Sequence, residues 1–215
     1  GERLMLAAPF TMEGEIERYL NNLTEAMRDT LKGEMGRGYD EAANWETGEP
    51  RHEWLFRLPA QAVVTNTQIY WTEECEASLE DLSGGQEDAV KRYLSTLENR
   101  LQELINKVLG FLEPGDRVKV ITIITLDVHG RDVVQRLVDE KVDGPENFIW
   151  QQQLRFIWVD ALEKDKSKSK SLDVTIKICD FKTTYFYEWI GNTGRLVITP
   201  LTDRCYVTLS MGLKL

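Results

Sequence analysis

The sequence predicts a mainly α fold, an antiparallel helical bundle with a small antiparallel β-hairpin or sheet near the C-terminus. Apolar residues recur at intervals of three and four over much of residues 13–152, which is the spacing of helices with one buried face. The connections between the long helices after residue 59 are short, as expected for antiparallel neighbours in a bundle. Near Leu154 the pattern changes to alternating runs rich in β-branched and aromatic residues, which is typical of strands.

Composition narrows the classes of function. The chain has 215 residues, 42% of them hydrophobic, which is enough for a sizeable buried core. Its formal net charge of −10 argues against binding to duplex nucleic acid, which requires a basic surface. No run of about 18 apolar residues occurs, so we expect no membrane-spanning helix. Cys75, Cys179 and Cys205 are far apart and form no CxxC pair, so we expect reduced thiols and no zinc site.

The first predicted helix covers residues 13–32, where the apolar side chains share one face. Three glycines follow at positions 33, 36 and 38, and we expect them to end the helix. Residues 33–58, which include Pro50, are predicted to be a loop that contains a short helical piece. The apolar face of the first helix consists of Ile16, Leu20, Leu23, Met27 and Leu31.

Further along, the helical spacing recurs in stretches that proline and glycine separate. Pro59 suits the first position of a helix, where its missing N–H is not needed. The stretch 86–112 carries the clearest apolar stripe, with charged and amide side chains opposite. Gly130 interrupts the following helix at a cost of roughly 1 kcal/mol relative to alanine. The helices expected in this region are 59–83, 86–112, 116–138 and 148–152.

The last quarter of the chain is predicted to contain strands and a final helix. Between the first two strands, residues 163–171 carry alternating lysines and are expected to form a solvated hairpin tip, or alternatively a contact with an acidic surface. A helix is predicted over 204–213, with Thr202 or Asp203 as its N-cap. The expected strands are 155–159, 172–179 and 185–190.

Catalytic motifs are absent from the sequence. It has no GxxxxGK[ST] phosphate loop, GxSxG or HExxH, and the glycines at 33, 36 and 38 do not follow a strand as in a dinucleotide fingerprint. We expect the carboxylates at 73, 74 and 76 to form a solvated helix face. His129 is expected to be a packing residue, and Arg131 and Asp132 to fix helix packing through a charge-assisted bond. No catalytic residue and no metal ligand is therefore predicted.

One stretch is recognisable as a whole. Residues 191–206, with the sequence GNTGRLVITPLTDRCY, resemble the segment of dynein heavy chains just ahead of their first AAA+ module. Other stretches resemble motifs of the dynein linker in the family's order, so that the resemblance covers about residues 55–211. The residues in these motifs are more similar to those of axonemal than of cytoplasmic dyneins. These stretches are LPAQ at 58–61 with QIYWT at 68–72, DVHGRDVV at 127–134, FIWQQQLR at 148–155 and YFYEWIG at 185–191.

The resemblance implies an organisation and a function. Residues 1–153 would be the helical linker bundle, 154–190 a β element bracing the linker root, and 191–215 the opening of the first AAA+ module, truncated. The linker would be the mechanical lever that couples ATP hydrolysis in the AAA+ ring to movement along microtubules. We expect the chain to be a fragment of something longer, because it begins without Met and stops within an apolar pattern.

The same resemblance implies cofactors, partners and a location. The fragment would hold no cofactor and be inactive alone, whereas the parent would use ATP and ADP with Mg. The rest of the AAA+ ring would be an intramolecular partner, the stalk of the parent would bind the microtubule, and its tail would bind intermediate and light chains. Nucleic acid and membrane are not expected as partners. The expected location is the cytoplasm and cytoskeleton, in the axoneme of a cilium or flagellum.

For the site, the resemblance implies a partial adenine-binding wall. Its apolar side chains would line a slot, Pro200 would fix the backbone and Leu201 would cover the base. The alternative is that this run is merely a buried strand and turn. Asp203 is expected to cap a helix and Arg204 to form a salt bridge. The residues expected in the wall are Leu196, Val197, Ile198, Pro200 and Leu201.

Two other functions stay open at this point. The chain could be a self-contained helical scaffold or adaptor with no catalytic activity. It could also be a small enzyme, which would require polar groups converging on one pocket, such as His129 beside a carboxylate in an open cavity.

Overall fold

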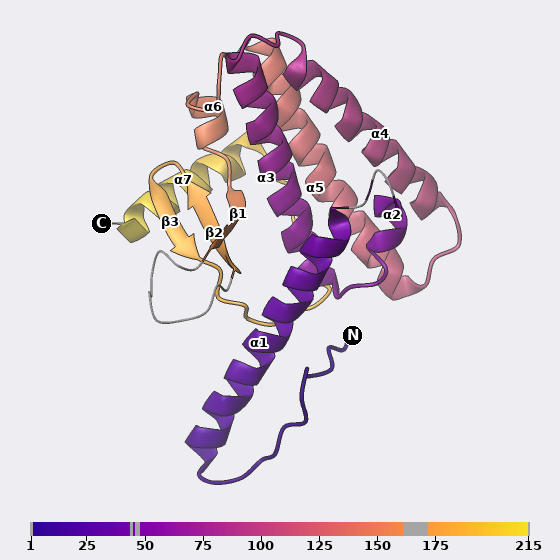
Figure 1. Cartoon of the computed structure of the whole chain (residues 1–215), viewed down its shortest axis with the longest axis vertical. Helices are drawn as coiled ribbons and strands as arrows, with labels where there is room; N and C mark the ends of the chain where they lie inside the picture. The colour runs from indigo at the N-terminus through magenta and orange to yellow at the C-terminus, as the bar shows by residue number, and fades with distance from the viewer. Residues whose placement is uncertain (1, 44, 46–47, 161–171, 215) are drawn as a thin grey trace.

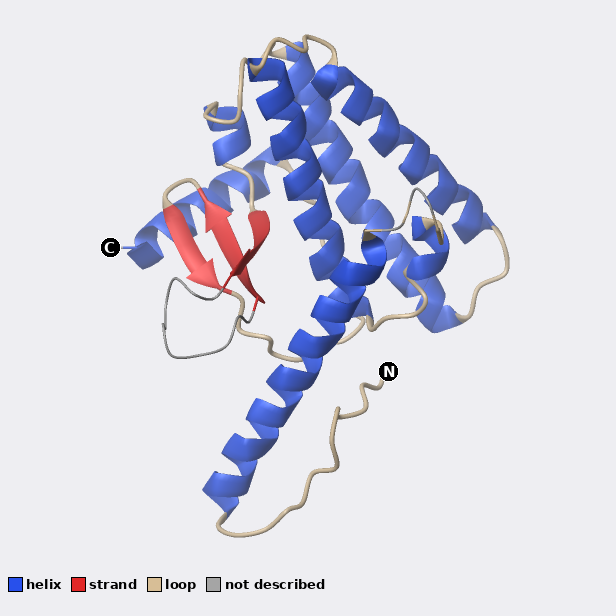
Figure 2. Cartoon of the chain, in the orientation of Figure 1, coloured by secondary structure: helices blue, strands red, loops and turns tan. Residues whose placement is uncertain are grey.

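The computed structural model describes residues 2–43, 45, 48–160 and 172–214. Within that part the chain is mainly α with one small antiparallel sheet, which confirms the predicted fold class (Figures 1 and 2). The Lys-rich tip expected at 163–171 lies outside the described residues. The elements are α1 Ile16–Ala42, α2 Arg51–Trp54, α3 Ala60–Ser83, α4 Ala89–Leu109, α5 Pro114–Asp139, α6 Phe148–Gln151, β1 Arg155–Asp160, β2 Leu172–Ile178, β3 Phe181–Thr184 and α7 Pro200–Lys214.

Helix α3 is the central element, with α4 and the sheet on opposite sides of it (Figure 1). Its first half contributes Val63 and Ile69 to a core shared with α1, α2, the start of α5 and the sheet. Its second half contributes Cys75 and Leu79 to a second core with α4, the end of α5 and α6. Burying this apolar surface is worth roughly 25 cal/mol per Å². In the described part, no helix is both long enough and apolar enough to cross a membrane.

The sheet has the order β1-β2-β3 with both pairs antiparallel. Strand β1 lies against α3, where the Phe156 N–H donates to Thr72 Oγ1 at 3.2 Å. The predicted third strand at 185–190 is wrong, because β3 covers Phe181–Thr184 directly after the hairpin turn. Tyr187 has φ +53°, which does not fit an extended strand, so this aromatic run continues as irregular chain.

Helix α1 continues through its glycines to Ala42, so the prediction that they end the helix is wrong. Gly38 is buried where α1 crosses α3. A Cβ at this position would lie 2.5 Å from Asn66 Nδ2 and 2.5 Å from Leu58 Cδ1. Asn66 Nδ2 in turn donates to the Met35 carbonyl at 2.9 Å. The glycine therefore permits a close helix crossing and does not mark a boundary.

The last helix begins at Pro200, earlier than predicted, and its cap is Thr199 in place of Thr202 or Asp203. The Thr202 N–H donates to Thr199 Oγ1 at 3.4 Å, and the Thr199 N–H donates to Thr202 Oγ1 at 3.3 Å. This reciprocal pair is the geometry of a capping box, and Pro200 then occupies the first helical position.

Candidate functional site

The irregular chain after β3 follows a path fixed by the sheet. We call residues 185–193 the strap. Its first residue, Tyr185, donates its N–H to the Val174 carbonyl at 2.9 Å. Tyr187 donates its hydroxyl to Asp173 at 2.6 Å and accepts the Val174 N–H at 3.1 Å. Burial, together with the neighbouring carboxylate, raises the pKa of Tyr187 well above its ordinary value.

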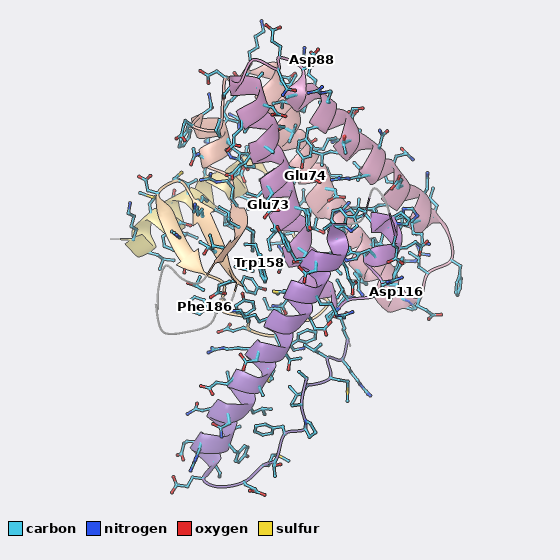
Figure 3. All side chains as sticks on the ribbon, in the orientation of Figure 1. Glu73, Glu74, Asp88, Asp116, Trp158 and Phe186 are labelled. Atoms are coloured by element: carbon cyan, nitrogen blue, oxygen red, sulfur yellow. The ribbon has the colours of Figure 1, made fainter. Side chains whose placement is uncertain are left out.

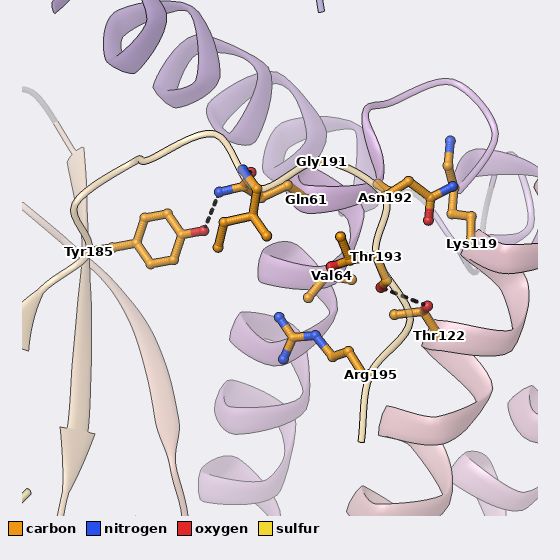
Figure 4. A pocket seen from close by; sticks show the side chains of 11 residues that line it. Gln61, Val64, Lys119, Thr122, Tyr185, Gly191, Asn192, Thr193 and Arg195 are labelled. Carbon is orange, nitrogen blue, oxygen red and sulfur yellow. Dashed lines mark hydrogen bonds between the residues drawn. The ribbon is translucent and has the colours of Figure 1, made fainter. Parts of the chain in front are cut away.

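Gln61, in the first turn of α3, holds the middle of the strap (Figure 4). Its Nε2 donates to the Tyr185 hydroxyl and to the Glu188 carbonyl, both at 2.7 Å. Its Oε1 accepts the Ile190 N–H at 2.8 Å. The side chain is 5% exposed, so these bonds form away from water. Sequence reasoning singled out the LPAQ motif but assigned no role to this amide.

The end of the strap lies against α5. Asn192 Nδ2 donates to the Gly115 carbonyl at 2.8 Å, and Thr122 Oγ1 lies 3.5 Å from the Thr193 carbonyl oxygen (Figure 4). The buried Lys119 lines the same hollow and donates to the Leu58 carbonyl at 2.9 Å. This hollow encloses only about 30 Å³, so it fits a water molecule and not a nucleotide.

Beyond the strap, the side chains expected in the adenine wall fall into two groups. Leu196 is 90% exposed, and Val197 and Leu201 are each 70% exposed. Ile198 and Pro200 instead line a second hollow of about 170 Å³ between α5, α6 and the start of α7. The run is therefore not a buried strand and turn, and its five apolar residues do not form a closed slot in this chain.

Polar groups from three elements meet in this second hollow. His129, Asp132 and Arg136 come from α5, Gln153 follows α6, and Asp203 belongs to α7. Burial lowers the pKa of His129, although the nearby Asp203 and Asp132 oppose that shift. Burial likewise raises the pKa of Asp203 against the influence of His129 and Arg136. A histidine beside carboxylates is thus present here.

The hollow has part of what an enzyme would require. His129 with a nearby carboxylate could exchange protons. Serine, cysteine and lysine are absent from the residues lining the hollow, and the Thr199 hydroxyl is engaged by Thr202. In the described part of the chain no group of His, Cys, Asp and Glu could hold a metal ion. The arrangement therefore suits a junction between α5 and α7.

The predicted packing role of Arg131 and Asp132 is wrong. These neighbours on α5 bind each other, and their side chains are partly exposed. Exposed pairs of this kind contribute little to stability. Asp127, earlier in the same motif, makes the interhelical contact, because it accepts Arg51 at 2.6 and 2.8 Å.

The carboxylates at 73, 74 and 76 do not form a solvated face, because each contacts a different element. Figure 3 labels Glu73 and Glu74 on α3. Glu73 accepts the Tyr39 hydroxyl of α1 at 3.0 Å, and burial raises its pKa. Burial and Glu73 raise the pKa of Tyr39 to about 12. The remaining contacts are Glu74 with Arg100 of α4 at 2.6 and 2.9 Å, and Glu76 with Arg155 of β1 at 3.2 Å. The three carboxylates therefore connect α3 to α1, α4 and β1, and they are not paired with one another.

Comparison with known proteins gives the family. Residues 185–215, from the start of the strap to the end of the chain, match a family described as the hydrolytic ATP binding site of the dynein motor region. The whole chain is 41% identical over 217 residues to dynein axonemal heavy chain 9 of Homo sapiens. It is 42% identical over 202 residues, 94% of the chain, to the ciliary dynein beta chain of Tripneustes gratilla.

A more distant relative gives the same result. The flagellar outer arm dynein beta chain of Chlamydomonas reinhardtii is 36% identical over the whole chain. The chain spans about 4% of the length of each of these relatives. Similarity along the full chain and the match over its last 31 residues, 185–215, identify it as a segment of a dynein heavy chain, related to the axonemal members.

Proposed function

We propose that this chain is the part of a dynein linker that runs into the first AAA+ module, with residues 1–153 as the linker bundle. Residues 154–190 brace the linker root and 191–215 open the AAA+ module. The observation that carries the proposal is the anchoring of the strap. The match to the ATP-binding family begins at Tyr185, and the bonds to Gln61 and Asn192 tie that region to α3 and α5 of the bundle.

The bundle has the properties of a lever. Helices α3, α4 and α5 pack against one another, and two buried clusters fill their interfaces. Ion pairs cross-link the elements, with Arg51 of α2 bound to Asp127 and Arg100 of α4 bound to Glu74. Because packed interiors have low compressibility, such a body transmits a displacement with little internal bending.

The nucleotide would be held only in part by this chain. In this proposal Leu196, Val197, Ile198, Pro200 and Leu201 form one wall of the adenine site. The exposure of Leu196 and Val197 supports it, because apolar side chains that face water here would be covered by a base and by the rest of the module. ATP or ADP with Mg would bind through phosphate contacts that a GK[ST] loop of the parent supplies.

The parent would act as a microtubule motor in a cilium or flagellum, consistent with the axonemal, ciliary and flagellar names of the relatives. Its further partners would be the rest of its own AAA+ ring, the microtubule through the stalk, and intermediate and light chains through the tail. The lever would convert ATP hydrolysis in that ring into movement.

Calorimetry with Mg–ADP tests the nucleotide role. The 215-residue chain alone should bind ADP more weakly than about 100 μM, because the phosphate contacts that dominate affinity are missing. In a heavy chain carrying this segment, Ile198→Ser should weaken ADP about tenfold, since a polar group then faces the base. Ile16→Ser, at an exposed isoleucine of α1, is the matched control and should leave ADP affinity unchanged.

Two results would contradict the proposal. Micromolar ADP binding by the chain alone would mean that it contains a complete site. Equal ADP affinity in the Ile198→Ser and Ile16→Ser heavy chains would show that this run does not form a wall of the adenine site.

A further inference from the structure

We propose that the side-chain amide of Gln61 is the positioning group through which the helical bundle controls the nucleotide segment. By fixing the strap it sets the place of Ile198 and Pro200, so a shift of α3 relative to the AAA+ module changes nucleotide affinity. This inference rests on the proposed function above. Through this residue the lever and the nucleotide would influence each other.

The Gln61 amide is fixed in one orientation by its partners. Nε2 faces two acceptors, the Tyr185 hydroxyl and the Glu188 carbonyl, whereas Oε1 faces one donor, the Ile190 N–H. If the amide were reversed, its nitrogen would meet the Ile190 N–H and its oxygen would meet the Glu188 carbonyl. Both contacts would be repulsive, so the side chain has one arrangement that satisfies all three groups.

Tyr185 and Tyr187 tie the first part of the strap to the sheet. The part that follows has no secondary structure of its own, so it depends on the bonds to Gln61. Two residues with positive φ interrupt the strap, Tyr187 at +53° and Gly191 at +71°. After the Ile190 N–H, the next firm anchor is Asn192 on the Gly115 carbonyl at 2.8 Å. The contact between Thr122 and Thr193, at 3.5 Å, is at the limit of a hydrogen bond. The position of the following run up to Pro200 therefore depends on the strap at one end and on the hollow with α5 and α6 at the other.

Gln61 also lies where movements of the bundle converge. It occupies the second position of α3, directly after Ala60, whose N–H donates to Glu2 Oε1 at 2.9 Å. Helix α3 packs against α1, α4, α5 and β1, so a displacement of any of them reaches the first turn of α3 through packed side chains. Figure 4 shows Gln61 reaching from this helix to the strap and Tyr185.

Hydrogen exchange in the 215-residue chain tests the local part of the inference. Gln61→Leu removes the acceptor of the Ile190 N–H, so protection of that amide should fall at least about tenfold. Protection of amides in the interior of α4 and α5 should not change. Gln68→Leu, at a half-buried glutamine of the same helix, is the matched control and should not expose Ile190. Unchanged protection of the Ile190 amide would contradict the proposed role of Gln61 in fixing the strap. An equal loss of protection in every helix would contradict it as well.

A double mutant distinguishes the hydrogen bonds of Gln61 from simple packing of its side chain. Tyr185→Phe removes one acceptor of the Gln61 amide and keeps the ring. If the amide and the hydroxyl act together, Gln61→Leu should loosen the strap by a smaller factor in the Tyr185→Phe background than in the original chain. Equal factors in both backgrounds would mean that the hydroxyl takes no part.

The affinity for Mg–ADP of a heavy chain carrying this segment tests the long-range part. Gln61→Leu should change that affinity at least about threefold, and Gln68→Leu should not. A loosened strap with unchanged ADP affinity would overturn the control of nucleotide by Gln61, while the effect of Ile198→Ser would still support the adenine wall. If Ile198→Ser has no effect, it is the proposed function that fails.

Discussion

At the scale of single residues, the glycines in helices show how close contact can outweigh helix propensity. Gly130 lies within α5, where a Cβ would come 2.7 Å from Trp71 Nε1. Gly38 has the same role on α1. Glycine costs about 1 kcal/mol relative to alanine in a helix, but only glycine lets these helices approach so closely.

Alanine at Gly130 should destabilise the fold by about 1–3 kcal/mol, because the added methyl forces Trp71 or the helix to move. Alanine at Gly33 is the matched control. This helical glycine has nothing within 4 Å of its Cβ position, so Gly33→Ala should stabilise the chain by about 0.5–1 kcal/mol. Urea unfolding followed by circular dichroism measures both, and a Gly130→Ala protein as stable as Gly33→Ala would contradict the packing argument.

The sequence could predict which residues face the core but not why particular polar or small residues stand there. The stripe on α4 is buried from Val90 to Leu104, because a period of three and four depends only on local geometry, whereas Leu109 at its end is 80% exposed. The role of Gly38 depends on Asn66, and that of Gln61 on Tyr185, far along the chain. Such pairings arise from tertiary contact, which a single sequence does not reveal.

At the scale of elements, short helix α2 is held by charge as well as by apolar burial. Arg51 binds Asp127 of α5 through its two terminal nitrogens, Nη1 and Nη2, and the two side chains are 8% and 10% exposed. The Arg51 guanidinium also lies 5.4 Å from the Trp45 ring, and that of Arg100 lies 5.6 Å from it. This cluster fixes α2 against the bundle.

Removing one partner of this pair should cost far more than removing an exposed one. Asp127→Ala leaves the Arg51 charge buried without its carboxylate, so the free energy of unfolding should fall by about 3–5 kcal/mol. Asp132→Ala, on the same helix, breaks the exposed pair with Arg131 and should cost less than about 1 kcal/mol. Thermal unfolding of both variants at equal pH measures the two losses of unfolding free energy. Similar losses would show that the buried pair contributes no more to stability than the exposed pair.

Element boundaries were predictable where local chemistry decides them. Helix α3 follows Pro59 and α6 begins after Asn147, which caps it by accepting the Ile149 N–H at 3.0 Å. The run at 185–190 has strand-like composition, but its backbone bonds to the side-chain amide of Gln61. The Ile190 N–H donates to this amide, and the Glu188 carbonyl accepts from it. Strand propensity reflects packing on a sheet, and here α3 supplies the competing partner.

At the scale of the whole molecule, α7 packs less deeply than the other described helices. None of its described residues is buried, whereas α3 is buried along most of its length. It docks at the hollow around His129, against β3, and through a contact of Lys214 with Asp180 at 4.0 Å. Several of its apolar side chains face water, which fits a helix that the rest of an AAA+ module would cover in the proposed parent. These are Leu201, Leu209 and Leu213.

The docking of α7 should weaken as pH falls from about 7.5 to about 5.5. Burial lowers the pKa of His129 in the docked state, so the undocked state takes up the proton first and gains population as pH falls through about 6.5. Asp203 and Asp132 attract the imidazolium and Arg136 repels it, and burial remains the larger influence on its pKa. Asp203 acts in the opposite direction, because its raised pKa favours docking when the carboxyl is protonated.

NMR titration of the α7 amides measures this dependence, with hydrogen exchange as a second readout. His129→Gln should remove most of the change between about pH 7.5 and about pH 5.5. His52→Gln, at the other histidine of the chain, is the matched control and should keep it. Asp203→Asn removes the opposing carboxyl, so docking in that variant should fall more steeply with acid. An α7 that stays equally docked across this range in the original chain would show that burial of His129 does not depend on the helix.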